Sequence, residues 1–417
     1  MKIFKQKRRG VMCAIASLLL LASCSQIGRS AQTAPEPIQN ENQDKASSAI
    51  TGEQQRDLQL LQNSNNHLGT QNSQGFYRLI VTGESHANIA YIDFDTEQMV
   101  YLCAQPNCTH QDKSCSSWID SNLMSGGLVA GEDFLYVFTI SGEIWKMNPD
   151  GTNREQICDI GVPLQLSGDI ATDGTHIFWM QTSATGNGSS LYSLDLSNKS
   201  AKVLKEYDAT GVLEAVNNNN LVVRLLSQDS TSQIVLFDVT TNTEQVLRNG
   251  DSSTEYGRIS SDMYVYFDYA DKSIKSFSLT EKSTRTIIDN LPVGENAPIY
   301  INEFIDNHLA FTIHHANGDG PYMIHDYYSL DLLNGNLIRQ LPIADNKGEE
   351  TAAAIAADMG SSYLVRSAIK VEEHNILMDD GTVSVQEGPF SYYSIISKED
   401  YWNGISNYRP ISVNFSL

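Results

Sequence analysis

The residues best suited to chemistry lie in residues 102–115, with the sequence LCAQPNCTHQDKSC. Three cysteines and one histidine occur here: Cys103, Cys108, His110 and Cys115. Three thiolates and an imidazole can hold a structural Zn²⁺ ion tetrahedrally. The spacing C-x4-C-x-H-x4-C differs from that of zinc ribbons, which counts against a metal site.

A further cysteine, Cys158, stands at a similar place in the following repeat. In an exported protein these four cysteines meet an oxidising compartment, and their even number favours disulfides. We therefore predict one disulfide within residues 102–115 and one between this segment and Cys158. Structural zinc and free thiols are the alternatives. In each case we expect the segment to fasten a loop on one rim of the molecule.

Three further histidines, His314, His315 and His325, lie close together in the chain. One interpretation is a metal or ligand site on a long hairpin, and the one we favour is a solvated hairpin. Adjacent residues of a strand point to opposite faces, so His314 and His315 are poorly placed to bind one ion together.

Motifs of known catalytic machinery are missing from the sequence. It contains no G-x-S-x-G, H-E-x-x-H, P-loop or G-x-G-x-x-G pattern. We therefore predict a protein that is not an enzyme and has no catalytic cofactor. Carboxylates that are distant in sequence can still meet at the axis of a ring, which a linear search does not detect.

The elements that must position these residues are repeated strands. The segment LYSLDL at 191–196 returns as YYSLDL at 327–332, and looser copies lie at 90–95, 143–148, 233–238, 273–278 and 391–396. Each copy alternates large apolar with small or polar residues, which is the pattern of a half-buried strand. Repeats of about 40–50 residues are typical of propellers. We predict an all-β, seven-bladed β-propeller over residues 75–417.

The ends of the propeller are also predicted from the strand pattern. The first repeat supplies only three strands, whereas residues 411–415 (ISVNF) alternate like a strand without an obvious partner. We expect this last segment to join the first blade, because closure removes exposed sheet edges. The Ala-rich run Thr351 to Met359 is expected to form an innermost strand, with a short helix as the alternative.

The N-terminus has the pattern of an export signal. Five basic residues within the first nine positions precede an apolar run from Val11 to Leu21. The following Leu-Ala-Ser-Cys24 resembles the lipobox of bacterial lipoproteins. The resemblance implies that residues 1–23 are removed and that Cys24 carries the acyl chains, palmitate among them, of a membrane anchor. An ordinary signal peptide is the alternative.

Composition characterises the segment after the anchor and excludes some partners. Residues 24–74 are polar with hardly any aromatics, so we predict a flexible linker. The formal net charge is −22, which argues against nucleic acid as a partner.

The strand pattern, the turn Asn148-Pro-Asp-Gly151 and the cysteine segment resemble TolB-like propellers. They resemble more closely the uncharacterised β-propeller lipoproteins of low-GC Gram-positive bacteria. The resemblance covers residues 75–417 and carries no catalytic residues. It implies a lipoprotein on the extracytoplasmic face of the cell membrane. We predict that this lipoprotein is a monomer and that its propeller binds a protein, peptide or glycan. The alternatives are a glycan lyase or hydrolase at the central channel and a structural subunit of an envelope complex.

Overall fold

The computed structural model describes residues 57–415, except 65, 121–126, 184, 185, 187, 292, 294–296, 317–322, 341, 345 and 349. The predicted signal peptide, the predicted lipidation site Cys24 and the first part of the predicted linker lie outside the described residues.

Short antiparallel strands dominate the described residues, and consecutive strands pair into sheets. Three sheets have four strands each, in the orders β10-β9-β8-β7, β19-β20-β21-β22 and β23-β24-β25-β26. Their strands are β7 (Gly127–Ala130), β8 (Leu135–Phe138), β9 (Glu143–Met147), β10 (Glu155–Asp159), β19 (Glu255–Ser260), β20 (Met263–Asp268), β21 (Ser273–Ser278), β22 (Thr284–Ile288), β23 (Ile299–Ile305), β24 (His308–Ala316), β25 (Met323–Asp331) and β26 (Leu337–Gln340).

A nine-stranded sheet contains two further four-stranded units and the first strand of the described chain. Its strands are β1 (Gln59–Leu61), β11 (Leu166–Thr172), β12 (His176–Thr182), β13 (Ser189–Asp195), β14 (Ser200–Tyr207), β15 (Thr210–Asn217), β16 (Asn220–Leu226), β17 (Thr231–Asp238) and β18 (Thr243–Asp251). One parallel bridge between Gly168 and Leu213 joins the two units. Gly168 has φ +89°, and a Cβ atom there would lie 2.1 Å from the Leu213 carbonyl oxygen, so the close approach requires glycine.

A ten-stranded sheet contains strands from both ends of the chain in the order β32-β31-β30-β3-β4-β5-β33, with β2, β29 and β6 at its sides. These strands are β2 (Thr70–Gln71), β3 (Gly75–Gly83), β4 (His86–Asp93), β5 (Gln98–Tyr101), β6 (Trp118–Asp120), β29 (Ala354–Asp358), β30 (Ser362–Leu377), β31 (Val383–Ser397), β32 (Arg409–Pro410) and β33 (Ser412–Val413). A small separate sheet pairs β27 (Ile343–Ala344) with β28 (Glu350–Thr351).

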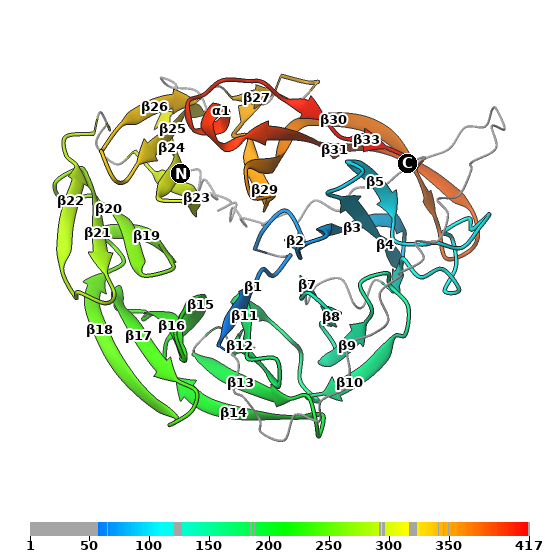
Figure 1. The fold of residues 1–417 in the computed structure, drawn as a ribbon, viewed down its shortest axis with the longest axis horizontal. Helices are drawn as coiled ribbons and strands as arrows, with labels where there is room; N and C mark the ends of the chain where they lie inside the picture. Colours follow the sequence, from blue (N-terminus) through cyan, green and yellow to red (C-terminus); the bar gives the residue numbers. More distant parts are fainter. Residues whose placement is uncertain are drawn as a thin grey trace, which may run out of the picture.

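The sheets stand side by side around a ring, with β11, β15, β19, β23 and β29 toward its centre (Figure 1). The predicted all-β fold is therefore confirmed, and its radial arrangement is that of a β-propeller. The repeated segments form strands, as expected. In β13, for example, Leu191 packs in one buried cluster and Leu194 in another, so apolar side chains are buried on both faces of the strand. A shift of register by one residue would move each of these side chains to the other face.

The predicted closing strand is confirmed. β33 runs parallel to β5, with Ser412 opposite Gln98 and Val413 opposite Met99. The Phe415 ring stacks on Tyr101, with ring centroids 4.3 Å apart. Strands from the N-terminal and C-terminal parts of the described chain therefore belong to one sheet, and β33 covers an edge of β5 that would otherwise be open.

The predicted linker boundary at Gly75 is wrong, because strands form before it. β1 pairs antiparallel with β11, and β2 pairs antiparallel with β3. Leu58 is 7% exposed and packs in a cluster with Phe178 and Leu213. This polar segment needs little apolar area of its own, because an existing sheet edge satisfies its backbone N–H and C=O groups.

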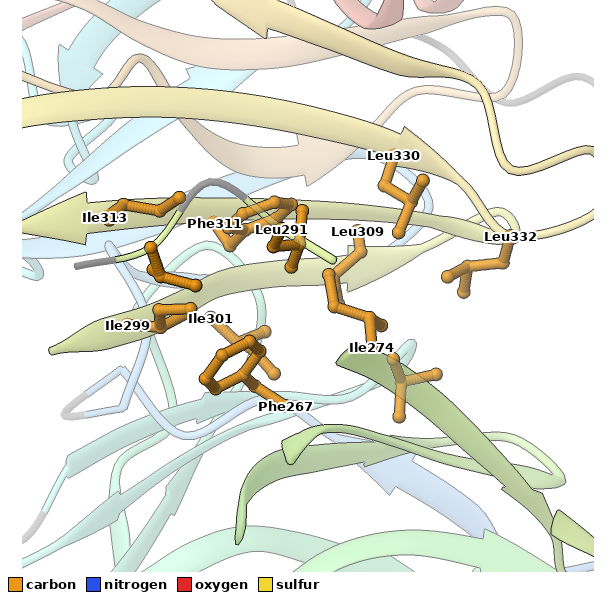
Figure 2. Packing of buried hydrophobic residues seen from close by; sticks show 12 residues of the cluster. Phe267, Ile274, Leu291, Ile299, Ile301, Leu309, Phe311, Ile313, Leu330 and Leu332 are labelled. Atoms are coloured by element: carbon orange, nitrogen blue, oxygen red, sulfur yellow. The ribbon is translucent and has the colours of Figure 1, made fainter. Parts of the chain in front are cut away.

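The core lies between neighbouring sheets. Figure 2 shows one cluster, in which Phe267 and Ile274 of one sheet meet Ile301, Leu309 and Phe311 of the next. Each of these side chains is at most 3% exposed. Full burial of such a side chain contributes about 1.5–3 kcal/mol, so contacts of this kind hold the sheets face to face.

The Ala-rich run contains the strand β29, as expected of an innermost strand, and the helical alternative is wrong. β29 pairs antiparallel with β30 through a register shift between Ile355 and Ala357. The helix of the described chain is α1 (Lys398–Trp402), capped by the Ser397 side chain, which accepts a hydrogen bond from Asp400 N. None of the helices in the described residues is long and apolar enough to cross a membrane.

Candidate functional site

The four residues of the cysteine segment converge, although the predicted disulfides are absent. The ligand atoms of Cys103, Cys108, His110 and Cys115 all lie within 4.8 Å of one another. All four described cysteines, including Cys158, are free. The structure contains no disulfide within residues 102–115, and the loop instead places the His110 ring beside a sulfur, with Nδ1 3.2 Å from Cys115 Sγ.

Cys158 does not join this group. It lies on β10 opposite Ile144 of β9, and its side chain packs against the buried cluster between two neighbouring sheets. Burial raises the pKa of the Cys158 thiol above its ordinary value. The predicted link between residues 102–115 and Cys158 is therefore wrong, and this thiol is part of the packing.

The three histidines of the later hairpin are divided between two faces, as the strand geometry predicted. His314 and His325 are paired across β24 and β25, and their ring centroids are 4.3 Å apart. His315 instead pairs with Asp326, at 3.1 Å between Nε2 and Oδ2. Among the described residues these histidines do not form a group that could hold a metal ion, whereas the cysteine segment does.

A cavity of about 620 Å³ lies inside the ring, and no pattern in the sequence predicts it. It is lined by the inner strands β11, β15, β19 and β23 and by the N-terminal segment around His67. Each of these four strands contributes one charged side chain to the lining. In strand order these side chains are Asp169, Glu214, Arg258 and Glu303. Equivalent positions on radial sheets face a common centre, so charges far apart in sequence meet here.

Two of these four charges already have partners. His67 Nε2 lies 3.0 and 3.1 Å from the two carboxylate oxygens of Asp169, and both side chains are mostly buried. Burial acts to lower the pKa of His67, but the hydrogen bond to Asp169 and the negative charges of Asp169 and Glu303 together outweigh burial and raise the pKa above the ordinary value. Glu214 accepts a hydrogen bond from Arg224 Nε at 2.7 Å and another from Ile259 N at 3.0 Å.

The side chains of Glu303 and Arg258 form no hydrogen bond or ion pair with another side chain or with the backbone in the described part of the chain. Burial raises the pKa of Glu303 to about 7, and the positive charges of His67 and Arg258 only partly oppose this effect. Near neutral pH the Glu303 carboxyl is therefore close to half protonated. A carboxyl group in this state both donates and accepts hydrogen bonds and can exchange a proton with a bound molecule.

The cavity thus contains an unpaired guanidinium, a carboxyl that titrates near neutrality and two neutralised pairs. Linear motifs did not reveal this site because each member is a single charged residue on a different strand. His67 was missed because it lies in the segment predicted to be a linker. The signal that could have found the others is a charged residue recurring once per repeat on a strand that is otherwise innermost and apolar.

No protein-family model matches the chain, and no curated protein matches it. Several solved structures resemble it, all at low identity. An oligogalacturonate lyase in complex with manganese is 10% identical, with a TM-score of 0.42, over 76% of this chain and 84% of that chain. TolB from Acinetobacter baumannii is 12% identical, with a TM-score of 0.36, over 79% and 77%. The β-propeller domain of the Trilobed protease from Pyrococcus furiosus is 10% identical, with a TM-score of 0.36, over 80% and 98%.

Proposed function

We propose that this chain is a seven-bladed β-propeller lipoprotein that binds a protein, peptide or glycan in the cavity of its ring. The count of seven follows if each nine- or ten-stranded sheet contributes two blades and each four-stranded sheet contributes one. The anchor is Cys24, which holds the propeller on the extracytoplasmic face of the cell membrane as a monomer. A tethered ring of this kind presents its binding site at a high local concentration near the membrane.

The observation that carries the binding function is the pair of unpartnered charged groups in the cavity. A cavity of about 620 Å³ is of the size that holds a small ligand or the end of a larger one. A ligand with complementary groups can replace the hydration of these side chains by charged hydrogen bonds, which are stronger than neutral ones. Arg258 offers a planar donor fork suited to a carboxylate. Glu303 offers a hydrogen-bonding partner for a hydroxyl or an ammonium group.

The ligand class that fits these groups is an acidic sugar or a peptide end, since both combine a carboxylate with neighbouring hydroxyl or amino groups. A calorimetric titration of the mature chain, residues 24–417 with Cys24→Ser, against acidic oligosaccharides and short peptides tests this. We expect Arg258→Ala to weaken binding about 10–100-fold, the loss of a charged hydrogen bond worth about 1.5–3 kcal/mol.

The matched control is Arg339→Ala, because Arg339 is exposed on β26 and pairs with Asp326 away from the cavity. It should leave the affinity unchanged. Equal affinities of wild type and Arg258→Ala for every ligand that binds would refute the cavity as the binding site.

The second candidate function is an enzyme built at the same cavity. It is favoured by Glu303, whose pKa of about 7 suits a general acid or base, next to the His67–Asp169 pair. In this case a bound glycan or peptide would be turned over, and the rate would follow an ionisation near pH 7. Glu303→Gln should abolish turnover while binding is retained. Turnover that survives this substitution would exclude Glu303 as the catalytic residue.

The membrane anchor is tested separately, in cells. Replacement of Cys24 by Ala should abolish labelling of the chain with a radioactive fatty acid and release the protein from the membrane fraction. A chain that is still labelled after this replacement would contradict lipidation at Cys24.

A further inference from the structure

The loop that contains Cys103, Cys108, His110 and Cys115 is shaped as a closed ligand set. Their ligand atoms lie within 4.8 Å of one another, and Zn²⁺ at the centre of a tetrahedron with bonds of about 2.0–2.3 Å separates its ligands by roughly 3.3–3.8 Å. A disulfide instead needs two sulfurs at about 2.05 Å and has no place for an imidazole. The described geometry therefore matches a metal site better than a covalent link.

The backbone of the loop holds these side chains in place. Cys108 N donates to Gln105 O and Cys115 N donates to Asp112 O, so each of these cysteines ends a tight turn. His110 has φ +59°, in the left-handed region that few residues other than glycine adopt, and this conformation directs its ring into the group. His110 N also donates to Cys108 Sγ at 3.4 Å.

A second layer of contacts supports the ligands from the neighbouring strand β4. Cys115 Sγ lies 3.0 Å from Ser117 Oγ, which donates to Asn88 Oδ1 at 3.2 Å. Asn88 Nδ2 in turn donates to the His110 carbonyl oxygen at 3.0 Å. Ser117 and Asn88 are both at most 1% exposed. Buried polar partners of this kind orient first-layer ligands in metal sites.

The neighbouring sheet, which contains β7 to β10, contributes a positively charged side chain and a turn that both contact this loop. Arg154, directly before β10, donates to the carbonyl oxygens of Ser116 and Trp118 and interacts electrostatically with Cys115. Three thiolates and one Zn²⁺ carry a net charge of −1, which this guanidinium offsets. The turn at Gly151 lies against the same loop, since a Cβ atom at Gly151 would be 2.4 Å from Ser116 O.

We propose that Cys103, Cys108, His110 and Cys115 bind one Zn²⁺ ion, which fixes the loop of residues 102–117 between its own sheet and the next. Four protein ligands leave no open position, so the site is structural and not catalytic. A loop without regular strands or a core of its own gains its order from the metal. The proposal is independent of the ligand cavity, which shares none of these residues.

The test uses the mature chain, residues 24–417 with Cys24→Ser, purified without chelators. Elemental analysis and native mass spectrometry should find about one zinc ion per chain. Replacement of zinc by Co²⁺ should produce the intense visible absorption of a tetrahedral thiolate site. Removal of the metal with a chelator should lower the melting temperature and open residues 102–117 to proteolysis, and added Zn²⁺ should reverse both effects.

The variants separate this site from the other thiol of the chain. Cys108→Ser and His110→Ala should each lose most of the bound zinc, whereas Cys158→Ser should keep about one ion per chain. The chelator experiment needs no variant, so it decides the question even if Cys108→Ser does not fold. A metal-free wild-type chain, or a mass two hydrogens lower without reductant because two of Cys103, Cys108 and Cys115 are joined, would overturn the proposal.

Discussion

Removal of the Glu303 carboxylate should stabilise the protein at neutral and alkaline pH but not in acid. The pKa of Glu303 is raised by burial from 4.5 to about 7, so the folded state holds its proton over a range in which the unfolded state has lost it. Below pH 4.5 both states are protonated and no cost arises. Between pH 4.5 and about 7 the unfolded state releases the proton that the folded state keeps, so stability falls across this window and stays lower above it.

The size of the effect follows from the shift of the pKa. A shift from 4.5 to about 7 corresponds to about 3.5 kcal/mol at most, at about 1.4 kcal/mol for each pH unit, and water in the cavity reduces this value. Glu303→Gln keeps the shape of the side chain and removes its ionisation. Its free energy of unfolding should therefore match that of wild type near pH 4.5 and exceed it by about 1–3 kcal/mol at pH 8.

Urea denaturation at several pH values between 4.5 and 8 measures the difference. The pKa of His67 is raised too, so stability also changes with pH through this group, and the quantity to compare is the difference in unfolding free energy between the variant and the wild type at each pH. Glu373→Gln, at an exposed position on β30, is the control and should show a difference that does not vary with pH. If the difference in unfolding free energy between Glu303→Gln and the wild type stays constant from pH 4.5 to 8, the pKa of Glu303 is not raised by burial and the prediction is wrong.

Three more predictions concern how the ring is held together. Arg224→Ala should cost about 3–5 kcal/mol in urea denaturation because it leaves Glu214 buried without its cation, and the double variant with Glu214→Ala should recover part of this loss. Gly168→Ala should lower the melting temperature, because the added Cβ meets the Leu213 carbonyl oxygen, and an unchanged melting temperature would contradict the bridge between the two units. Deletion of residues 411–417 should uncover the edge of β5 and promote association, seen as increased light scattering, whereas a stable monomer would show that β33 is not needed for closure.

The cysteine segment shows why composition alone misled. The even number of thiols and the predicted export favour disulfides, and the sequence spacing fits no common zinc motif. The path of the backbone between the three cysteines and His110 decides which of their side chains meet. The left-handed residues Asn107 and His110, at φ +60° and +59°, fold the loop so that an imidazole stands among three sulfurs. Such a conformation depends on the contacts of the loop with Asn88 and Arg154, which come from other parts of the chain.

The order of residues along the chain specifies the local structure of this protein. Alternation of apolar and polar residues is a property of a few neighbouring positions, so segments such as 191–196 and 411–415 were identified as strands without any knowledge of their partners. Which side chains meet depends instead on how the sheets pack. His67, Asp169, Arg258 and Glu303 share a cavity because radial sheets direct equivalent positions to one centre. The environment of a buried charge, and with it the pKa of Glu303, depends on groups that no local pattern connects.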